Sequence, residues 1–225
     1  MDFIIENGTL IRYTGTNAVV VVPPEVRALQ QDAFFGQSHV TRVVLPQGIT
    51  EVPAALFHSC ENLQSVVIPE GVTAIENGAF FQCRRLQSIS IPKGVVRLGS
   101  GAFQGCQSLQ SVALPEGLTT LGDGAFMECR QLQSVLLPQS VTSIGKQAFC
   151  LCEKLESIRL PEGITTIRER TFDGCKGLQL VRVPGSVQAV EFGAFRFCEE
   201  LVLSGPADSY GQFFACENGI MYMID

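Results

Sequence analysis

The chain has 225 residues, of which 46% are hydrophobic and 17% are charged, and its formal net charge is −6. This composition excludes an intrinsically disordered chain, which would be poor in hydrophobic residues and rich in charge. An acidic chain with scattered Lys and Arg is also a poor candidate for binding nucleic acid. The sequence contains no apolar run of the ~20 residues needed to cross a bilayer, so we expect no membrane insertion.

Residues 1–17 precede a repeat and contain a predicted β-hairpin. The segments 3–5 and 10–13 are mostly apolar and flank Asn7-Gly8, a pair that is typical of tight hairpin turns. We expect this hairpin to cover the open edge of the stack that follows, because terminal strands of a repeat array otherwise stay unpaired.

A 23-residue period runs through residues 18–203. A proline recurs at this interval, and a phenylalanine follows each proline by 11 residues. The phenylalanines are Phe34, Phe57, Phe80, Phe103, Phe126, Phe149, Phe172 and Phe195. A cysteine lies three residues after the phenylalanine in every coil except the first, where Gln37 replaces it. These cysteines are Cys60, Cys83, Cys106, Cys129, Cys152, Cys175 and Cys198. A fixed period of this length predicts eight stacked coils.

Each coil is predicted to contain two short extended segments and one tight turn. The segment 109–114, L-Q-S-V-A-L, alternates in hydrophobicity and is typical of a strand with one buried face. The proline after it ends the strand, because proline cannot donate a ladder hydrogen bond. A V-T-x-I segment is expected to form the second extended piece. The G-A-F-x-x-C segment is expected to form a helical turn that directs Ala, Phe and Cys inward. Stacking would pair each strand in parallel with the next coil.

The register breaks after Leu201, and residues 204–225 are predicted to close the stack. Asp208 or Ser209 can cap a short helix that runs through Glu217, with Gly219 as its left-handed stop. Residues 220–224 would return as a last strand. We therefore expect one domain over 1–225, with a hairpin cap at 1–17, repeats at 18–203 and a helix–strand cap at 204–225.

The repeat unit L-P-x-x-V-T-x-I-x-x-x-A-F-x-x-C-x-x-L-x-S-V resembles the BspA-type, or Treponema-type, leucine-rich repeat. The resemblance covers roughly residues 18–203, and the segment 209–220 is similar to the usual C-terminal cap of that family. Together with the period, it implies an α/β repeat solenoid: a right-handed leucine-rich-repeat coil of eight repeats, with a parallel β-sheet on one face and short helical turns on the other. The resemblance also implies protein or surface recognition, and it carries no catalytic residues to transfer.

Cysteine and histidine are the candidate chemical groups. We expect the column cysteines to be buried thiols, because parallel side chains do not converge on a tetrahedral zinc ion. Their expected spacing of about 4.8 Å leaves disulfide bridging geometrically open, although parallel Cβ directions disfavour it. Cys150 lies off the column, where other coils have Gln104 or Met127, and we predict it to be an exposed, reactive thiol. His39 and His58 occupy variable positions without a fixed Asp or Ser companion, so we expect no catalysis, no metal and no cofactor.

Two glycine pairs, Gly99 with Gly101 and Gly122 with Gly124, superficially suggest phosphate-binding loops. Both pairs lie just before the Ala-Phe step of the repeat, and the third glycine of the dinucleotide motif is missing. We interpret these glycines as turn residues.

The outward strand positions are therefore the candidate binding surface. One outward column is nearly all serine, whereas another changes from coil to coil. Its members are Val44, Val67, Ser90, Ala113, Leu136, Arg159 and Arg182. Exposed aliphatic residues beside arginine are typical of protein interfaces, although ordinary β-forming residues on a solvated sheet would give the same pattern. The predicted partner-binding residues are Val44, Val67, Leu136, Arg159 and Arg182.

We predict a monomeric, non-catalytic scaffold that presents the outward face of its sheet to a partner protein. A cytoplasmic location is expected, because the first residues do not form a secretory signal and the cysteines do not suggest disulfide pairs. The alternative is a bacterial cell-surface adhesin or host-contact protein, if the native gene adds a leader. An enzyme would need a polar cleft, which none of the repeat columns provides.

Overall fold

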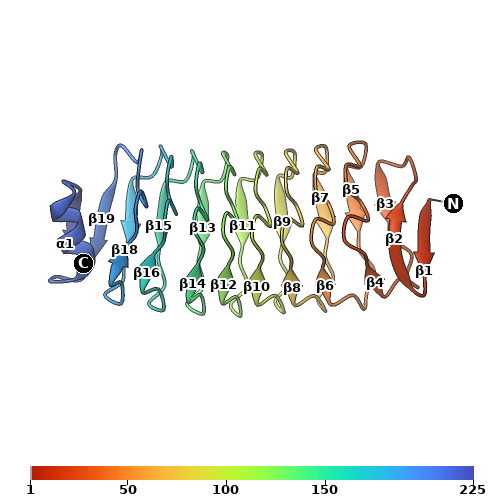
Figure 1. Cartoon of the computed structure of the whole chain (residues 1–225), viewed down its shortest axis with the longest axis horizontal. Helices are drawn as coiled ribbons and strands as arrows, with labels where there is room; N and C mark the ends of the chain where they lie inside the picture. Colours follow the sequence, from red (N-terminus) through yellow and green to blue (C-terminus); the bar gives the residue numbers. More distant parts are fainter. Residues whose placement is uncertain (1) are drawn as a thin grey trace.

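The computed structural model describes residues 2–225 as an elongated stack of coils. A hairpin lies at the N-terminal end of the stack and a helix at the C-terminal end (Figure 1). The coils contribute strands to two parallel ladders along the stack, of which the first is interrupted once and the second twice. The fold is therefore a parallel β-solenoid.

The first ladder contains the longer strand of each coil. In the described residues it consists of β3 (Val19–Val21), β5 (Arg42–Val44), β7 (Ser65–Val67), β9 (Ser88–Ser90), β11 (Ser111–Ala113), β13 (Ser134–Leu136), β15 (Ser157–Arg159), β17 (Leu180–Arg182) and β19 (Val202–Gly205). We call the outward side of these strands the sheet face. The sequence predicts eight coils, whereas β19 begins a ninth turn. The residues after β19 complete this turn with a helix and a strand instead of the repeat.

The second ladder lies on the other side of the core and contains strands of two residues each. They are β4 (Ala28–Leu29), β6 (Glu51–Val52), β8 (Ala74–Ile75), β10 (Arg97–Leu98), β12 (Thr120–Leu121), β14 (Ser143–Ile144), β16 (Thr166–Ile167) and β18 (Ala189–Val190). The V-T-x-I segment therefore forms the second extended piece, as its pattern indicates.

The turns between the second ladder and the next long strand are not helical, which corrects the expected helical turns. Each turn has two residues with left-handed backbone, and a helix cannot continue through such a residue. The first column of these residues is Asp32, Ala55, Gly78, Gly101, Gly124, Gln147, Arg170 and Gly193. The second is Gly36, Ser59, Gln82, Gly105, Glu128, Leu151, Gly174 and Phe197. The chain therefore makes isolated turns whose N–H groups are free to pair with the neighbouring coil.

A stack of buried phenylalanines forms the centre of the core. The rings from Phe34 to Phe195 follow one another with centroid separations of 5.1–5.6 Å. Tyr13 continues the stack at the N-terminal end, and Phe214 contacts its last ring at the C-terminal end. The core is thus one continuous column rather than a set of separate clusters.

The two glycine pairs have two different structural roles. Gly101 and Gly124 have φ of +60°, the left-handed region that glycine enters without strain. Gly122 instead permits close approach, because a Cβ on it would lie 2.5 Å from backbone atoms of Gly99 and Ser100. The sequence interpretation as turn residues holds for Gly101 and Gly124, and the close approach of Gly122 to the preceding coil adds a stacking role that the sequence analysis did not predict.

The two ends of the stack differ in which ladder they extend. At the N-terminal end, β1 (Phe3–Glu6) pairs antiparallel with β2 (Thr9–Tyr13), and β2 pairs in parallel with β4. At the C-terminal end, α1 (Tyr210–Glu217) begins after Ser209, whose Oγ accepts a hydrogen bond from the Gln212 N–H. The chain then returns as β20 (Met221–Ile224), which pairs in parallel with β19. Added strands therefore extend the second ladder at the N-terminal end and the first ladder at the C-terminal end.

Within residues 2–225, the structure has no helix whose length and apolar character would let it span a membrane.

Candidate protein-binding surface

The sheet face is built by the alternation of side chains in three-residue strands. The middle residue of each strand points into the core, and the residues before and after it point outward. In β13, Val135 is buried with 6% of its surface exposed, whereas its neighbour Leu136 is 77% exposed. Repetition of this pattern produces two outward columns along the stack.

The structure places the five predicted partner-binding residues in one outward column, but in two separate groups. Val44 and Val67 are paired neighbours on β5 and β7. Leu136 is on β13, and the paired residues Arg159 and Arg182 follow on β15 and β17. Two strands with small side chains, β9 and β11, separate the two groups. At ~4.8 Å per strand the groups are about 15 Å apart.

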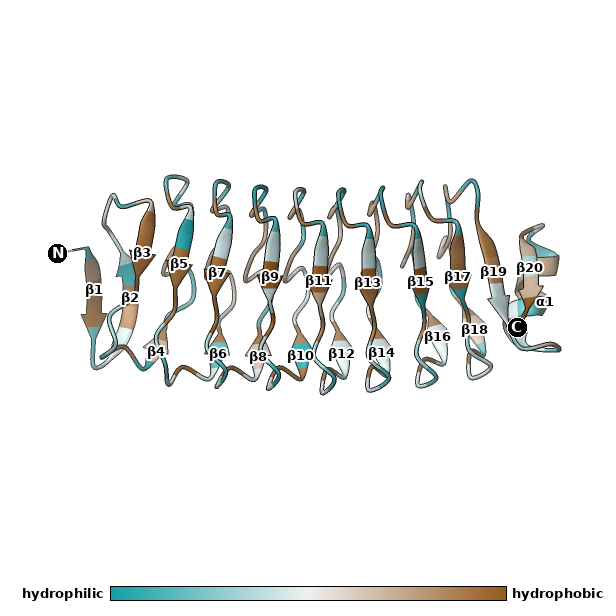
Figure 2. Ribbon diagram, turned by 180° about the vertical axis from the view of Figure 1, so that it is seen from behind, coloured by the Kyte–Doolittle hydropathy of each residue, from teal (hydrophilic) through white to brown (hydrophobic). Residues whose placement is uncertain are grey.

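The group that contains Val44 and Val67 extends further toward the N-terminus than the sequence predicted, because it also includes valines of β3. Val19 and Val21 on β3 are 58% and 64% exposed, and Val21 pairs with Val44. Figure 2 shows β3 as one of the most hydrophobic strands of the face. The signal was available in the sequence, because Val21 lies one 23-residue period before Val44.

The sheet face has the opposite charge balance to the rest of the molecule. Its outward positions on β3 to β19 carry Arg42, Arg159 and Arg182 and, in these described strands, no Asp or Glu. The chain as a whole has a net charge of −6. The carboxylate of Glu156 lies beside the face, one residue before β15. A partner on this face therefore meets guanidinium groups among aliphatic side chains.

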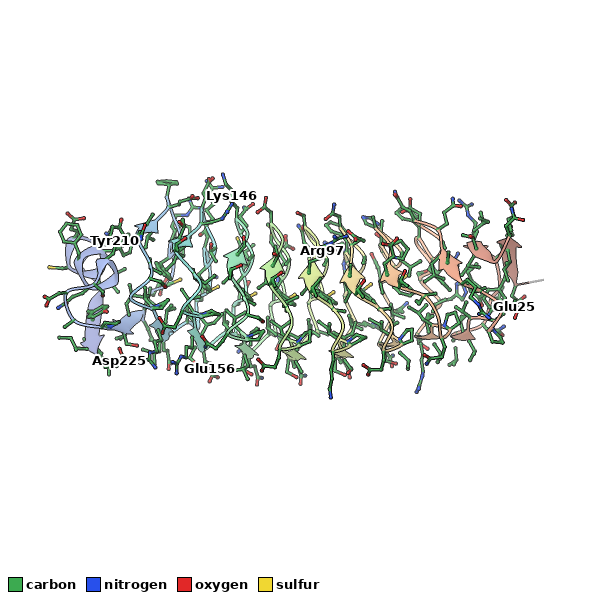
Figure 3. All side chains as sticks on the ribbon, turned by 90° about the horizontal axis from the view of Figure 1, so that it is seen from below. Glu25, Arg97, Lys146, Glu156, Tyr210 and Asp225 are labelled. Carbon is green, nitrogen blue, oxygen red and sulfur yellow. The ribbon has the colours of Figure 1, made fainter. Side chains whose placement is uncertain are left out.

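The two neighbouring arginines differ in how far they are free to bind a partner. The Arg182 Nε lies 2.5 Å from the Asp225 Oδ2, so the tail already neutralises this guanidinium. Arg159 is exposed and has no ion pair with any residue that the structure describes. In Figure 3, the side chains of Asp225 and Glu156 lie along the same long edge of the molecule. Arg159 is therefore the available cation of the C-terminal group.

A depression lies on the sheet face between Leu136 and Arg159. Within the described ladder, β13 and β15 pair over one residue position, Ser134 with Ser157, whereas β11 and β13 pair over three. A hollow of about 270 Å³ follows this separation and is lined by residues of both strands. The second ladder is interrupted at the same junction, because β14 and β16 belong to different sheets. The ladders are also interrupted between β7 and β9 and between β4 and β6, so the junction of β13 and β15 is set apart by its hollow and by the change of the outward residues from small to large.

The seven cysteines of the repeat column are structural groups. In each column position the thiol donates to the carbonyl of the phenylalanine 26 residues earlier, as from the Cys106 Sγ to the Phe80 oxygen at 3.2 Å. Burial raises the pKa of Cys60 to about 12. The prediction for Cys150 is wrong: this residue is buried, and desolvation together with the nearby Asp173 carboxylate raises its pKa to about 11. Cys216 on α1 is the exposed cysteine.

The two histidines lie on the turn side of the stack. The His58 ring is sandwiched between Phe35 and Phe81, with centroid separations of 4.9 and 4.7 Å. His39 is exposed and stacks at 6.2 Å on Tyr13. In the part of the chain that the structure describes, no group of three or more His, Cys, Asp or Glu side chains is placed to hold a metal ion.

These features define a class, the parallel β-solenoid with an exposed sheet face. The chain belongs to the family described as the BspA type leucine rich repeat region, whose profile matches it in six copies over residues 13–99 and 73–202. Membership indicates a protein-interaction or surface scaffold, and leucine-rich-repeat scaffolds are generally not enzymes. A comparison with curated proteins finds no significant match.

Two solved structures illustrate the relationship. The leucine rich repeat protein of T. pallidum is 26% identical with a TM-score of 0.63, and the match covers 96% of this chain and 89% of that one. A leucine rich cell surface protein from Faecalibacterium prausnitzii is 22% identical with a TM-score of 0.55, and the match covers 95% of this chain and 94% of that one. Both share the solenoid fold with this chain.

Proposed function

We propose that the protein is a non-catalytic scaffold that binds a partner protein on its sheet face, at the depression between Leu136 and Arg159. The observation that carries the proposal is the coincidence of three features at one junction. The first is the most exposed leucine of the chain, the second is an arginine without an ion pair among the described residues, and the third is a local separation of the strands.

The chemistry of the junction favours an acidic or amide-bearing partner segment with an apolar side chain. A guanidinium can form two parallel hydrogen bonds with a carboxylate, and its stem packs on apolar surface. Leu136 would supply the apolar contact, with the hollow beside it receiving a side chain. The valine group on β3, β5 and β7 would extend the contact for a longer partner. Arg182 would contribute less, because its guanidinium already forms a salt bridge with Asp225.

The test is a double substitution, Leu136→Glu with Arg159→Glu. Both side chains are exposed, so the melting temperature should change little. Binding of the partner that the intact chain retains should weaken tenfold or more, about 1.4 kcal/mol. The matched control is Val96→Glu with Arg168→Glu, which makes the same charge change on exposed residues of the other side. Equal affinity of the two folded variants would contradict the proposal.

The second candidate is a cell-surface adhesin or host-contact protein. The name of the Faecalibacterium prausnitzii protein, a cell surface protein of the same fold, supports this alternative to a monomeric cytoplasmic scaffold. The two candidates differ in location and partner but use the same face. Immunolabelling of intact and permeabilised cells separates them: labelling of intact cells supports the adhesin, and labelling only after permeabilisation supports the cytoplasmic scaffold.

A further inference from the structure

We propose that the C-terminal end of the second ladder binds an extended, basic segment of a partner protein, which pairs with the open edge of β18. This surface is separate from the sheet face, and the proposal does not depend on the function proposed above. Four features of the last coil carry it: unpaired backbone donors, unpaired backbone acceptors, an apolar groove and an acidic rim.

The turn of the last coil has three N–H groups without partners. In the preceding coil, the N–H groups of Arg170, Phe172 and Gly174 donate to carbonyls of the last coil at 3.2, 2.8 and 2.8 Å. The equivalent groups belong to Gly193, Phe195 and Phe197. In the described chain these three N–H groups donate no hydrogen bond. They face the side where a further coil would lie.

The β18 strand likewise presents unused acceptors. The carbonyls of Thr165 and Ile167 in the preceding coil each accept an N–H of the last coil at 2.8 Å. The equivalent carbonyls of Gln188 and Val190 accept none from residues that the structure describes. An extended peptide has donors and acceptors at the spacing of a strand, so it can satisfy such an edge by adding to the sheet.

The tail does not pair with this edge, because β20 pairs with β19 and α1 packs mainly on β19 and β20. Figure 1 shows α1 beyond β19 at the C-terminal end of the stack. The N-terminal end differs, since there β2 pairs with β4 and completes the second ladder. The second ladder is thus open only at its C-terminal end in the described chain.

An apolar groove of about 460 Å³ lies beside the open edge. Phe195 and Phe214, whose ring centroids are 6.2 Å apart, line the groove together with Val190 and Ile220. Phe192, which also lines it, is 73% exposed. Apolar side chains of an added strand would enter this groove.

The rim of the groove is acidic. The exposed residues Glu199 and Glu200 directly follow the lining residue Cys198 in the sequence, and the exposed Glu217 directly precedes the lining residue Asn218. Glu191 also lines the groove, and its Oε2 accepts a hydrogen bond from the Glu169 N–H of the preceding coil at 2.8 Å. The one cation among the lining residues is Arg196, which already binds the buried Asp173 through two hydrogen bonds of 2.7 and 3.2 Å. The groove therefore favours Lys and Arg in its occupant, whereas the sheet face favours carboxylates. The two surfaces select different partners.

The proposal is tested with the full chain and a fluorescent heptapeptide that alternates basic and apolar residues, Lys-Val-Arg-Phe-Lys-Val-Arg. We expect saturable binding in an anisotropy titration. Glu199→Lys with Glu200→Lys should weaken it at least tenfold. The control, Glu70→Lys with Glu116→Lys, makes the same change in net charge on exposed glutamates elsewhere and should change it less than twofold.

Two further measurements separate strand addition from general attraction. The same peptide with N-methyl groups at alternate amides should bind at least tenfold more weakly, because it cannot complete the ladder. Equal weakening by the two double variants, or equal binding of the N-methylated peptide, would overturn the proposal, as would absence of binding. A concentration-dependent dimer that Phe192→Glu dissociates would also overturn it, because a second copy would then be the occupant.

Discussion

At the scale of single residues, the contacts between coils depend on side chains that repeat with the backbone. Phe126 lies between the rings of Phe103 and Phe149 at 5.4 and 5.6 Å and is fully buried. The column could be predicted because repetition places identical residues at identical positions. The burial of Cys150 and the pairing of Arg182 with Asp225 could not, because each depends on a residue outside the repeat consensus or in the tail.

The phenylalanine column gives the first stability prediction. Phe126→Ala should lower the free energy of unfolding by ~3–5 kcal/mol, because it leaves a cavity between two stacked rings. Urea unfolding followed by circular dichroism measures the change. Leu136→Ala is the control, since the same kind of deletion at an exposed leucine should cost less than about 1 kcal/mol. Equal effects of the two substitutions would show that the column is not a continuous core.

At the scale of elements, the turns show what a repeat consensus leaves open. The G-A-F-x-x-C segment has the composition of a short helix, yet two left-handed residues in every coil prevent one. Non-glycine residues such as Ala55 and Arg170 occupy these positions in some coils, so glycine alone does not reveal them. The strands were easier to predict, because the period of two in hydrophobicity and the following proline both indicate them.

The close approach of neighbouring turns gives a prediction at this scale. Gly122→Ala should destabilise the protein by about 1–3 kcal/mol, because the new Cβ would overlap the backbone of the preceding coil at 2.5 Å. Gly117→Ala is the matched control in the same coil, since its Cβ would meet its nearest atom at 3.8 Å. Thermal unfolding of both variants measures the difference. A Gly122 variant as stable as the control would mean that the turns are not in close contact.

At the scale of the whole molecule, repetition yields a solenoid with two surfaces of opposite preference. The sheet face carries arginine and aliphatic residues, whereas the C-terminal end carries an acidic rim around an apolar groove. The sequence predicted the first surface because its outward columns are regular enough for exceptions to stand out. It did not predict the second, since the open edge of β18 depends on where α1 packs.

The state of the nine cysteines gives a prediction for the whole chain. All nine are free thiols in the structure, and eight are buried or half-buried. A thiol reagent should react quickly with Cys216 alone in the native protein, and with all nine after denaturation without reductant. The raised pKa of Cys150 adds to its protection, because the thiolate is the reactive form. Fewer than nine thiols after denaturation would indicate disulfides and an oxidising location.

The central claim is that a partner protein contacts the sheet face at the junction of β13 and β15. Site-specific photo-crosslinking tests it most directly, with benzoylphenylalanine at position 136 on the sheet face and, in a second protein, at position 96 beside the second ladder. Leu136 and Val96 are both exposed, at 77% and 46%, so either position accepts the probe without disturbing the core. Irradiation in an extract of the native organism should give a single crosslinked protein from position 136. An excess of the unmodified chain added before irradiation should prevent this crosslink, whereas an excess of the Leu136→Glu, Arg159→Glu double variant should not. The same crosslinked protein at equal yield from position 96, or none from position 136, would contradict the account.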